Sequence, residues 1–176
     1  MNRRRLEGEA LRDAILVVSG QLDAGIGGTV NTWKPKMFSV DDANVEMANY
    51  DTRRRSIYLP IVRGAAVHEM LQLFDFGDPN SITTRRGVST VAPQALFLMN
   101  NRWVHQQAAQ FAERLEADTE HDAVGRIRHA YRLALARDPT DRELQRAVNF
   151  IDPPDAKQWE LFCQMLLCLN EFAYLE

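Results

Sequence analysis

The chain has 176 residues, of which 45% are hydrophobic and 26% are charged, and its formal net charge is −3. This length is sufficient for one domain with an apolar core, and we expect a single domain over residues 1–176. Basic residues are not concentrated in one tail, which argues against binding of nucleic acid. No apolar run approaches the roughly 18 residues of a membrane span, so we expect no such span.

The first half of the sequence alternates one clear helix with long irregular stretches. Leu6–Val18 has apolar residues at helical spacing, and Ser19-Gly20 ends the pattern. Residues 23–53 contain several glycines and little periodicity, which predicts a long loop. Residues 54–62 are rich in Ile, Leu and Val around Pro60, which favours a short strand or extended segment.

The second half is predicted to consist of successive helices. Helical spacing is present in Ala65–Phe74, from Pro93 to Leu115 with a bend near Asn100, in Val124–Ala134, and in Trp159–Phe172. Thr140 and Glu143 have the spacing of a capping box, which predicts a further helix to Ile151. We interpret the stripe Trp159, Phe162 and Leu166 as core rather than as a binding face. The predicted fold is mainly α: an irregular helical bundle with long loops and at most a short extended or β segment near 54–62.

Clustered arginines are the first candidate for a ligand site. Arg53–Arg55 lie in one segment and Arg85-Arg86 in a later polar loop. Guanidinium groups bind sulfate, phosphate and carboxylate oxygens bidentately, so these loops could form an anion pocket. The alternative, which we favour, is that the arginines form ion pairs with carboxylates such as Asp75, Asp78 or Glu9.

Asp75, Asp78 and Asn80 supply oxygen ligands within six residues. Their spacing differs from that of a calcium-binding EF-hand loop, and Asp and Asn favour turns without any metal. We therefore predict no metal site. The ligand-binding candidates are Arg54, Arg55, Arg85, Arg86, Asp75 and Asp78.

No cofactor or catalytic set emerges from the remaining reactive residues. Cys163 and Cys168 form no C-x-x-C pair and are predicted to be buried free thiols. The four histidines form no H-E-x-x-H motif, and no serine has the context of a nucleophile elbow. We expect no cofactor in this chain, and the catalytic residues of any enzymatic activity stay unknown.

Several short segments together carry a resemblance to a known family: Arg4–Glu7, Glu9–Asp13, Ser19–Asp23, Gly27-Gly28, Arg54–Pro60, Phe74-Asp75, Asp78-Pro79, Arg85–Thr90, Pro93–Asn100, Ala130–Leu135 and Asn170–Phe172. In these segments the sequence resembles the C-terminal part of a planctomycete-type domain of unknown function, the PSD family, found in large surface proteins with cytochrome-c-like domains. The resemblance implies a location in the cell envelope, with haem carried by an upstream domain. A chain starting at Met1 without a signal peptide would instead be cytoplasmic.

Two functional hypotheses follow. Members of the family continue from a longer upstream portion, so this chain is expected to be a truncated domain whose exposed apolar face is covered by upstream domains or a protein partner. The leading hypothesis is a non-catalytic binding or scaffold module of a multidomain envelope protein, with an anionic glycan as a candidate ligand. The alternative is an enzyme or enzyme accessory acting on extracellular polysaccharide or in envelope redox chemistry, with acid and base drawn from Glu9, Asp13, Asp75 and Asp78.

Overall fold

Helices dominate the computed structural model, which describes residues 4–28, 30, 50–61, 67–82, 86–118, 122–153 and 155–175. In chain order the elements are β1 (Arg4–Arg5), α1 (Gly8–Val18), the 3₁₀ helix η3 (Ser56–Tyr58), α2 (Glu69–Leu73), α3 (Ala92–Asn100), α4 (Arg102–Glu116), α5 (Ala123–Leu135), α6 (Asp141–Ile151), α7 (Ala156–Cys168), α8 (Asn170–Ala173) and β2 (Tyr174–Leu175). The prediction of a mainly α fold is confirmed.

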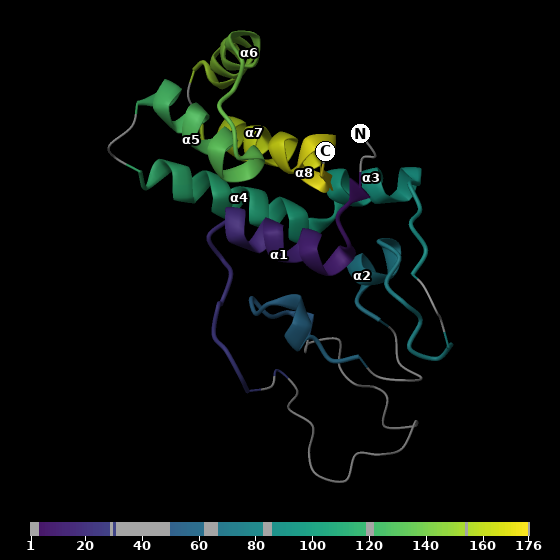
Figure 1. Ribbon diagram of the computed structural model, residues 1–176. Helices are drawn as coiled ribbons and strands as arrows, with labels where there is room; N and C mark the ends of the chain where they lie inside the picture. The colour runs from purple at the N-terminus through teal and green to yellow at the C-terminus, as the bar shows by residue number, and fades with distance from the viewer. Residues whose placement is uncertain are drawn as a thin grey trace.

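The core is organised around α4, which packs most extensively on α7 and also contacts α1 and α5 (Figure 1). Phe111 of α4 and Phe162 and Leu166 of α7 are almost completely buried. Trp159 is 3% exposed and packs edge-to-face on Phe162, with ring centroids 5.9 Å apart. The interpretation of the α7 aromatic stripe as core is therefore confirmed.

Several helix ends follow the local signals in the sequence. Thr140 Oγ1 accepts a hydrogen bond from the Glu143 N–H, and Glu143 Oε2 accepts one from the Thr140 N–H, which confirms the capping box of α6. Asn101 lies between α3 and α4, and its side chain accepts from the Trp103 N–H. The predicted bend near Asn100 is thus a complete helix break with a new N-cap.

Two short strands bring the ends of the described chain together. β1 and β2 pair antiparallel, with Arg4 opposite Leu175 and Arg5 opposite Tyr174. The Leu6 N–H also donates to the Ala173 carbonyl at 2.8 Å. This pairing fixes Arg5 beside the segments that follow α2 and precede α3.

The segment at 54–62 differs from the sequence expectation. Its described part forms η3 and one isolated parallel bridge between Asp23 and Arg54, rather than a strand. Ile57 is 77% exposed, so the apolar run does not present one buried face. Side chains of α1 take the hydrogen-bonding groups that a neighbouring strand would have used. Most of the predicted loop at 23–53 lies outside the described residues.

Candidate functional site

Arg5 is the centre of the first polar network. Its guanidinium donates to Asp75 Oδ2 at 2.7 Å, to the Ser89 carbonyl at 2.6 Å and to the Phe74 carbonyl at 3.2 Å. Burial raises the pKa of the Asp75 carboxyl, but hydrogen bonds from the Ser89 N–H, Arg5 and the Ser89 hydroxyl bring it below its ordinary value. Asp75 thereby joins β1 to the segments after α2 and before α3.

Arg12 and Asp13 of α1 form the second network. Arg12 is 1% exposed and donates to the carbonyls of Thr52 and Arg54 and to Ser56 Oγ. Asp13 Oδ1 accepts from both the Ser56 N–H and its hydroxyl, each at 2.7 Å. Together these side chains attach residues 52–56 to α1, which explains why this segment forms no strand.

The candidate arginines are placed separately. Arg54 donates to the carbonyls of Gly25 and Gly27 and stacks 4.0 Å from the Tyr58 ring centroid. Arg55 lies 3.9 Å from Asp13 Oδ2, and its side chain is 58% exposed. Arg86 donates to Glu9 at 2.7 Å and to Glu7 at 3.3 Å. Arg85 lies outside the described residues.

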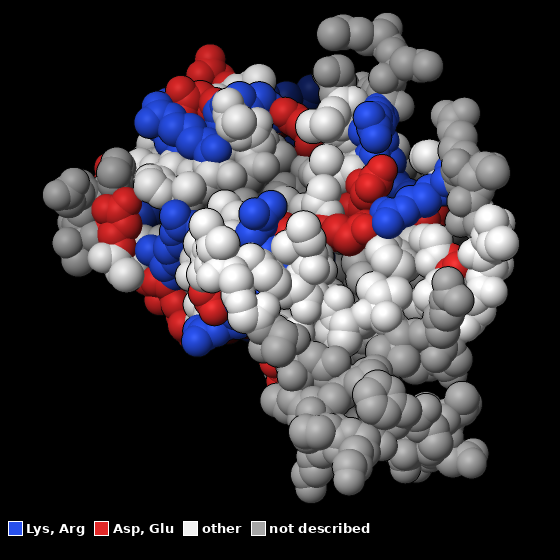
Figure 2. All heavy atoms as spheres, turned by 60° about the horizontal axis from the view of Figure 1, so that its bottom comes forward, with Lys and Arg blue, Asp and Glu red and all other residues white. Residues whose placement is uncertain are grey.

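Among the described residues, Arg54, Arg55 and Arg86 do not line a common cavity. On the face shown in Figure 2, basic and acidic side chains lie next to one another rather than in a patch of one sign. Asp78 accepts from the N–H and the side-chain amide of Asn80, as expected for a turn. Among the described residues, no cluster of His, Cys, Asp or Glu could hold a metal ion.

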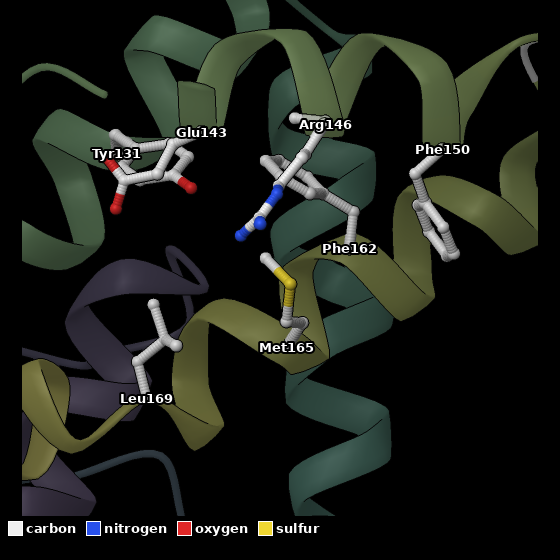
Figure 3. Close-up of a pocket in the computed structure, with 8 residues that line it drawn as sticks. Tyr131, Glu143, Arg146, Phe150, Phe162, Met165 and Leu169 are labelled. Carbon is white, nitrogen blue, oxygen red and sulfur yellow. The ribbon is translucent and has the colours of Figure 1, made fainter. Parts of the chain in front are cut away.

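A concave site lies instead in the C-terminal half, between α5, α6 and α7. This cavity of about 450 Å³ is lined by Tyr131, Glu143, Arg146, Ala147, Phe150, Phe162, Met165 and Leu169, and we call it the α6–α7 pocket (Figure 3). Its volume is in the range of ordinary ligand sites. Phe150 is 47% exposed and Met165 44%, so the apolar wall is open to solvent.

The two charged groups of the α6–α7 pocket have different surroundings. Glu143 accepts two hydrogen bonds at 2.9 Å from Arg137, which also binds Glu171. The hydrogen bond from Arg137 and those from Thr140 lower the pKa of Glu143 to about 2 despite partial burial, so its charge is compensated. Arg146 makes no hydrogen bond or ion pair with the described residues, and its guanidinium extends from α6 towards Met165 (Figure 3).

Two further cavities border other parts of the fold. A polar groove of about 830 Å³ shares Glu143 and Leu169 with the α6–α7 pocket and continues along α8 to Tyr174. A smaller cavity of about 240 Å³ is lined by Tyr50, Asp51, His68, Glu69, Phe97, Asn101 and Trp103. Burial and the charge of Arg12 lower the pKa of His68 to about 4, so its imidazole is neutral at pH 7.

The cysteines are free thiols, as expected. Cys163 is fully buried in the core, whereas Cys168 is half-buried. Burial raises the pKa of both thiols, which keeps them protonated and poorly nucleophilic. Within the described part of the chain, no helix is long and apolar enough to cross a membrane.

The α6–α7 pocket was not predicted from the sequence, because its side of α7 lies outside the buried aromatic stripe. Leu161 and Met165, one helical turn apart on another face of α7, are 42% and 44% exposed. The sequence signal for the pocket was therefore this second apolar face of α7, which the buried face with Phe162 and Leu166 cannot account for. The exposed Phe150, across the pocket on α6, could be assigned to it only from the tertiary structure.

The described structure is thus mainly helical, with an open apolar pocket and with loops held by buried arginines. A family model matches residues 1–151, and the chain belongs to that family, PSD1, described as a protein of unknown function (DUF1553). The resemblance expected from the sequence is confirmed at this level, although Asn170–Phe172 lies beyond the matched residues. No curated protein and no solved structure matches the chain.

Proposed function

We propose that the chain is a non-catalytic scaffold and binding module of a multidomain cell-envelope protein, and that the α6–α7 pocket receives an apolar group of a binding partner. The observation that carries this proposal is the open apolar wall formed by Phe150 and Met165. Apolar surface of this kind is stabilised when a partner removes it from water. Location in the envelope is proposed from the family resemblance and is tested by fractionating native cells.

The polar networks support a scaffold role over catalysis. The carboxylates considered as acid and base are engaged within the fold: Glu9 with Arg86, Asp13 with Ser56, and Asp75 with Arg5 and Ser89. Groups held in this way position loops, since each links two segments distant in sequence. They are poorly placed to exchange protons with a substrate.

Binding of a neutral apolar dye, Nile red, tests the proposed pocket. Phe150→Ser and Met165→Gln are expected to remove most of the fluorescence increase that the dye shows with the unmodified chain. Leu96→Gln is the matched control, because Leu96 is 55% exposed on α3 and lies outside the pocket lining. Dye binding that is absent from the unmodified chain, or lost equally in the control, would contradict the proposal.

Anionic-glycan binding is a second candidate function, favoured by the exposed Arg55. Its guanidinium lies 3.9 Å from the nearest Asp13 oxygen, which is a weak pairing that leaves the group accessible. Thermal shift with heparin and polygalacturonate tests this candidate. Stabilisation that is lost in Arg55→Ala but kept in Arg102→Ala would support it, and equal shifts in both variants would count against it.

The enzyme alternative is favoured by the cavity at His68. A neutral imidazole and the carboxyl groups of Asp51 and Glu69 line the same cavity beside Trp103. Convergence of such groups in a concave site is a common property of active sites. Release of reducing ends from a panel of neutral polysaccharides tests this alternative. Activity abolished by Glu69→Gln, with Glu113→Gln on α4 as control, would support an enzyme.

A further inference from the structure

The two apolar faces of α7 indicate that the helix needs cover on both sides. Phe162, Cys163 and Leu166 lie in the core. Leu161 and Met165 lie four residues apart on α7 and therefore share another face, and both are exposed. A helix that is apolar on two sides is ordinarily buried on both. Leu161 and Met165 thus form an apolar surface of α7 that the described residues leave exposed.

Two basic side chains of α6 lie at or beside this surface, Arg146 in the pocket lining and Arg142 one helical turn before it. Arg142 and Arg146 lie four residues apart on α6, are both exposed, and make no ion pair with the described residues. Two acidic groups nearby are already paired, Glu143 with Arg137 and Glu160 with Lys157. Like charges four residues apart destabilise a helix slightly, and an acidic partner would relieve this repulsion.

The backbone around the pocket favours a helical occupant over an extended one. The pocket is lined by residues of α5, α6 and α7 and by Leu169, which follows α7. None of these lining residues belongs to a strand, so an extended peptide would find no sheet edge with which to form ladder hydrogen bonds. A helix satisfies its own backbone and can pack its side chains between α6 and α7.

Resting on the proposed function of the α6–α7 pocket, we propose that its occupant is an amphipathic α-helix of a protein partner. Apolar side chains spaced three and four residues apart would contact Phe150, Leu161 and Met165. Acidic side chains along one border of that helix would pair with Arg142 and Arg146. Guanidinium groups suit this role because they bind carboxylates bidentately.

Two designed, fluorescein-labelled peptides of about 20 residues test the inference on the full chain by fluorescence anisotropy. Both carry the same leucines at helical spacing, and one has glutamates and the other lysines on the flanking positions. We expect the glutamate peptide to bind at least about tenfold more tightly at low salt, with the difference shrinking as salt screens the charges. A scrambled glutamate peptide that cannot form an apolar face should not bind.

A charge reversal gives the decisive comparison. The double variant Arg142→Glu, Arg146→Glu is expected to prefer the lysine peptide, whereas Arg102→Glu on α4 should keep the original preference. Circular dichroism and thermal unfolding establish that each variant is folded. Arg146→Gln, a milder change, should lower the affinity for the glutamate peptide without inverting the preference.

The outcomes distinguish the proposed acidic helix from the more general proposal that the α6–α7 pocket binds an apolar group. Equal affinity for the glutamate and lysine peptides, or a preference that survives the charge reversal, would overturn the acidic-helix inference. Nile red binding without binding of either designed peptide would also overturn it, while leaving an apolar pocket in place. Failure of both the dye and the peptides would remove the proposed function as well.

Discussion

The two halves of the molecule are held together by different kinds of interaction. In the C-terminal half, α4 and α7 pack through buried apolar side chains such as Phe111 and Phe162. In the N-terminal half, the buried guanidinium groups of Arg5 and Arg12 donate to backbone carbonyls of irregular segments. Helices satisfy their own backbone groups, whereas irregular segments need side chains to do so.

The two halves also differ in whether their arginines are available to a binding partner. Arginines that stabilise loops have their donors occupied and are less available to an external anion. Arg146, on a helix that needs no such support, has its donors available. The guanidinium that is available to a partner therefore lies on α6, in the C-terminal half.

The largest loss of stability is predicted for a core substitution in the C-terminal half. Phe162→Ala is expected to lower the free energy of unfolding by about 3–5 kcal/mol, because it leaves a cavity beside Trp159 and Tyr131. Urea denaturation measures the loss. Leu161→Ala, at a neighbouring position that is 42% exposed, should cost less than about 1 kcal/mol. Equal losses would contradict the assignment of Phe162 to the core.

A smaller and more local effect is predicted in the arginine-anchored half. Arg12→Met leaves the carbonyls of Thr52 and Arg54 without their donor and should cost about 2–3 kcal/mol. Hydrogen exchange should accelerate mainly in residues 50–61, with α7 changed less. Arg102→Met is the exposed control. An acceleration equally large in α7 would show that the two halves do not differ in the way proposed.

The cavity at His68 predicts a dependence of the free energy of unfolding on pH between 6.5 and 4. The folded-state pKa of about 4 lies below the usual 6.5, so below pH 6.5 the unfolded chain binds a proton that the folded chain does not. Stability is therefore complete above pH 6.5 and is lost as the pH falls towards 4, by about 3 kcal/mol.

Titration of the His68 ring protons by NMR measures that pKa directly. His68→Gln should flatten the stability profile between pH 6.5 and 4, whereas His105→Gln, an exposed control, should leave it unchanged. A measured pKa near 6.5 would show that Arg12 and burial do not act on this ring as described.

The smallest effect is predicted at the start of α6. Thr140→Ala removes the hydroxyl that accepts from the Glu143 N–H and should cost about 0.5–1 kcal/mol. Thr140→Ser keeps the hydroxyl and should behave like the original chain in thermal unfolding. A loss in the serine variant as large as in the alanine variant would show that the cap hydrogen bond is not the cause.

Helix existence could be predicted from the sequence because its signals are local. The apolar spacing of residues 6–18, the capping box at Thr140 and the aromatic stripe at Trp159 all correspond to structure that formed as expected. The sequence predicted only a bend where α3 ends and α4 begins. An Asn N-cap between two apolar runs, here Asn101, has the same pattern as a surface residue within one continuous helix. A short strand or extended segment was predicted near 54–62 because the residues there favour strands locally. The described part of that segment forms η3 and a single bridge to Asp23.

The sequence by itself determined the helical class, the family and the boundaries of most helices, since periodicity and caps act within a few residues. The tertiary structure alone decided how the arginines are used, because Arg5 and Arg12 reach carbonyls tens of residues away in the chain. It also decided which apolar side chains remain exposed. The pocket between α6 and α7 depends on how far two packed helices diverge, and local sequence patterns do not encode that separation.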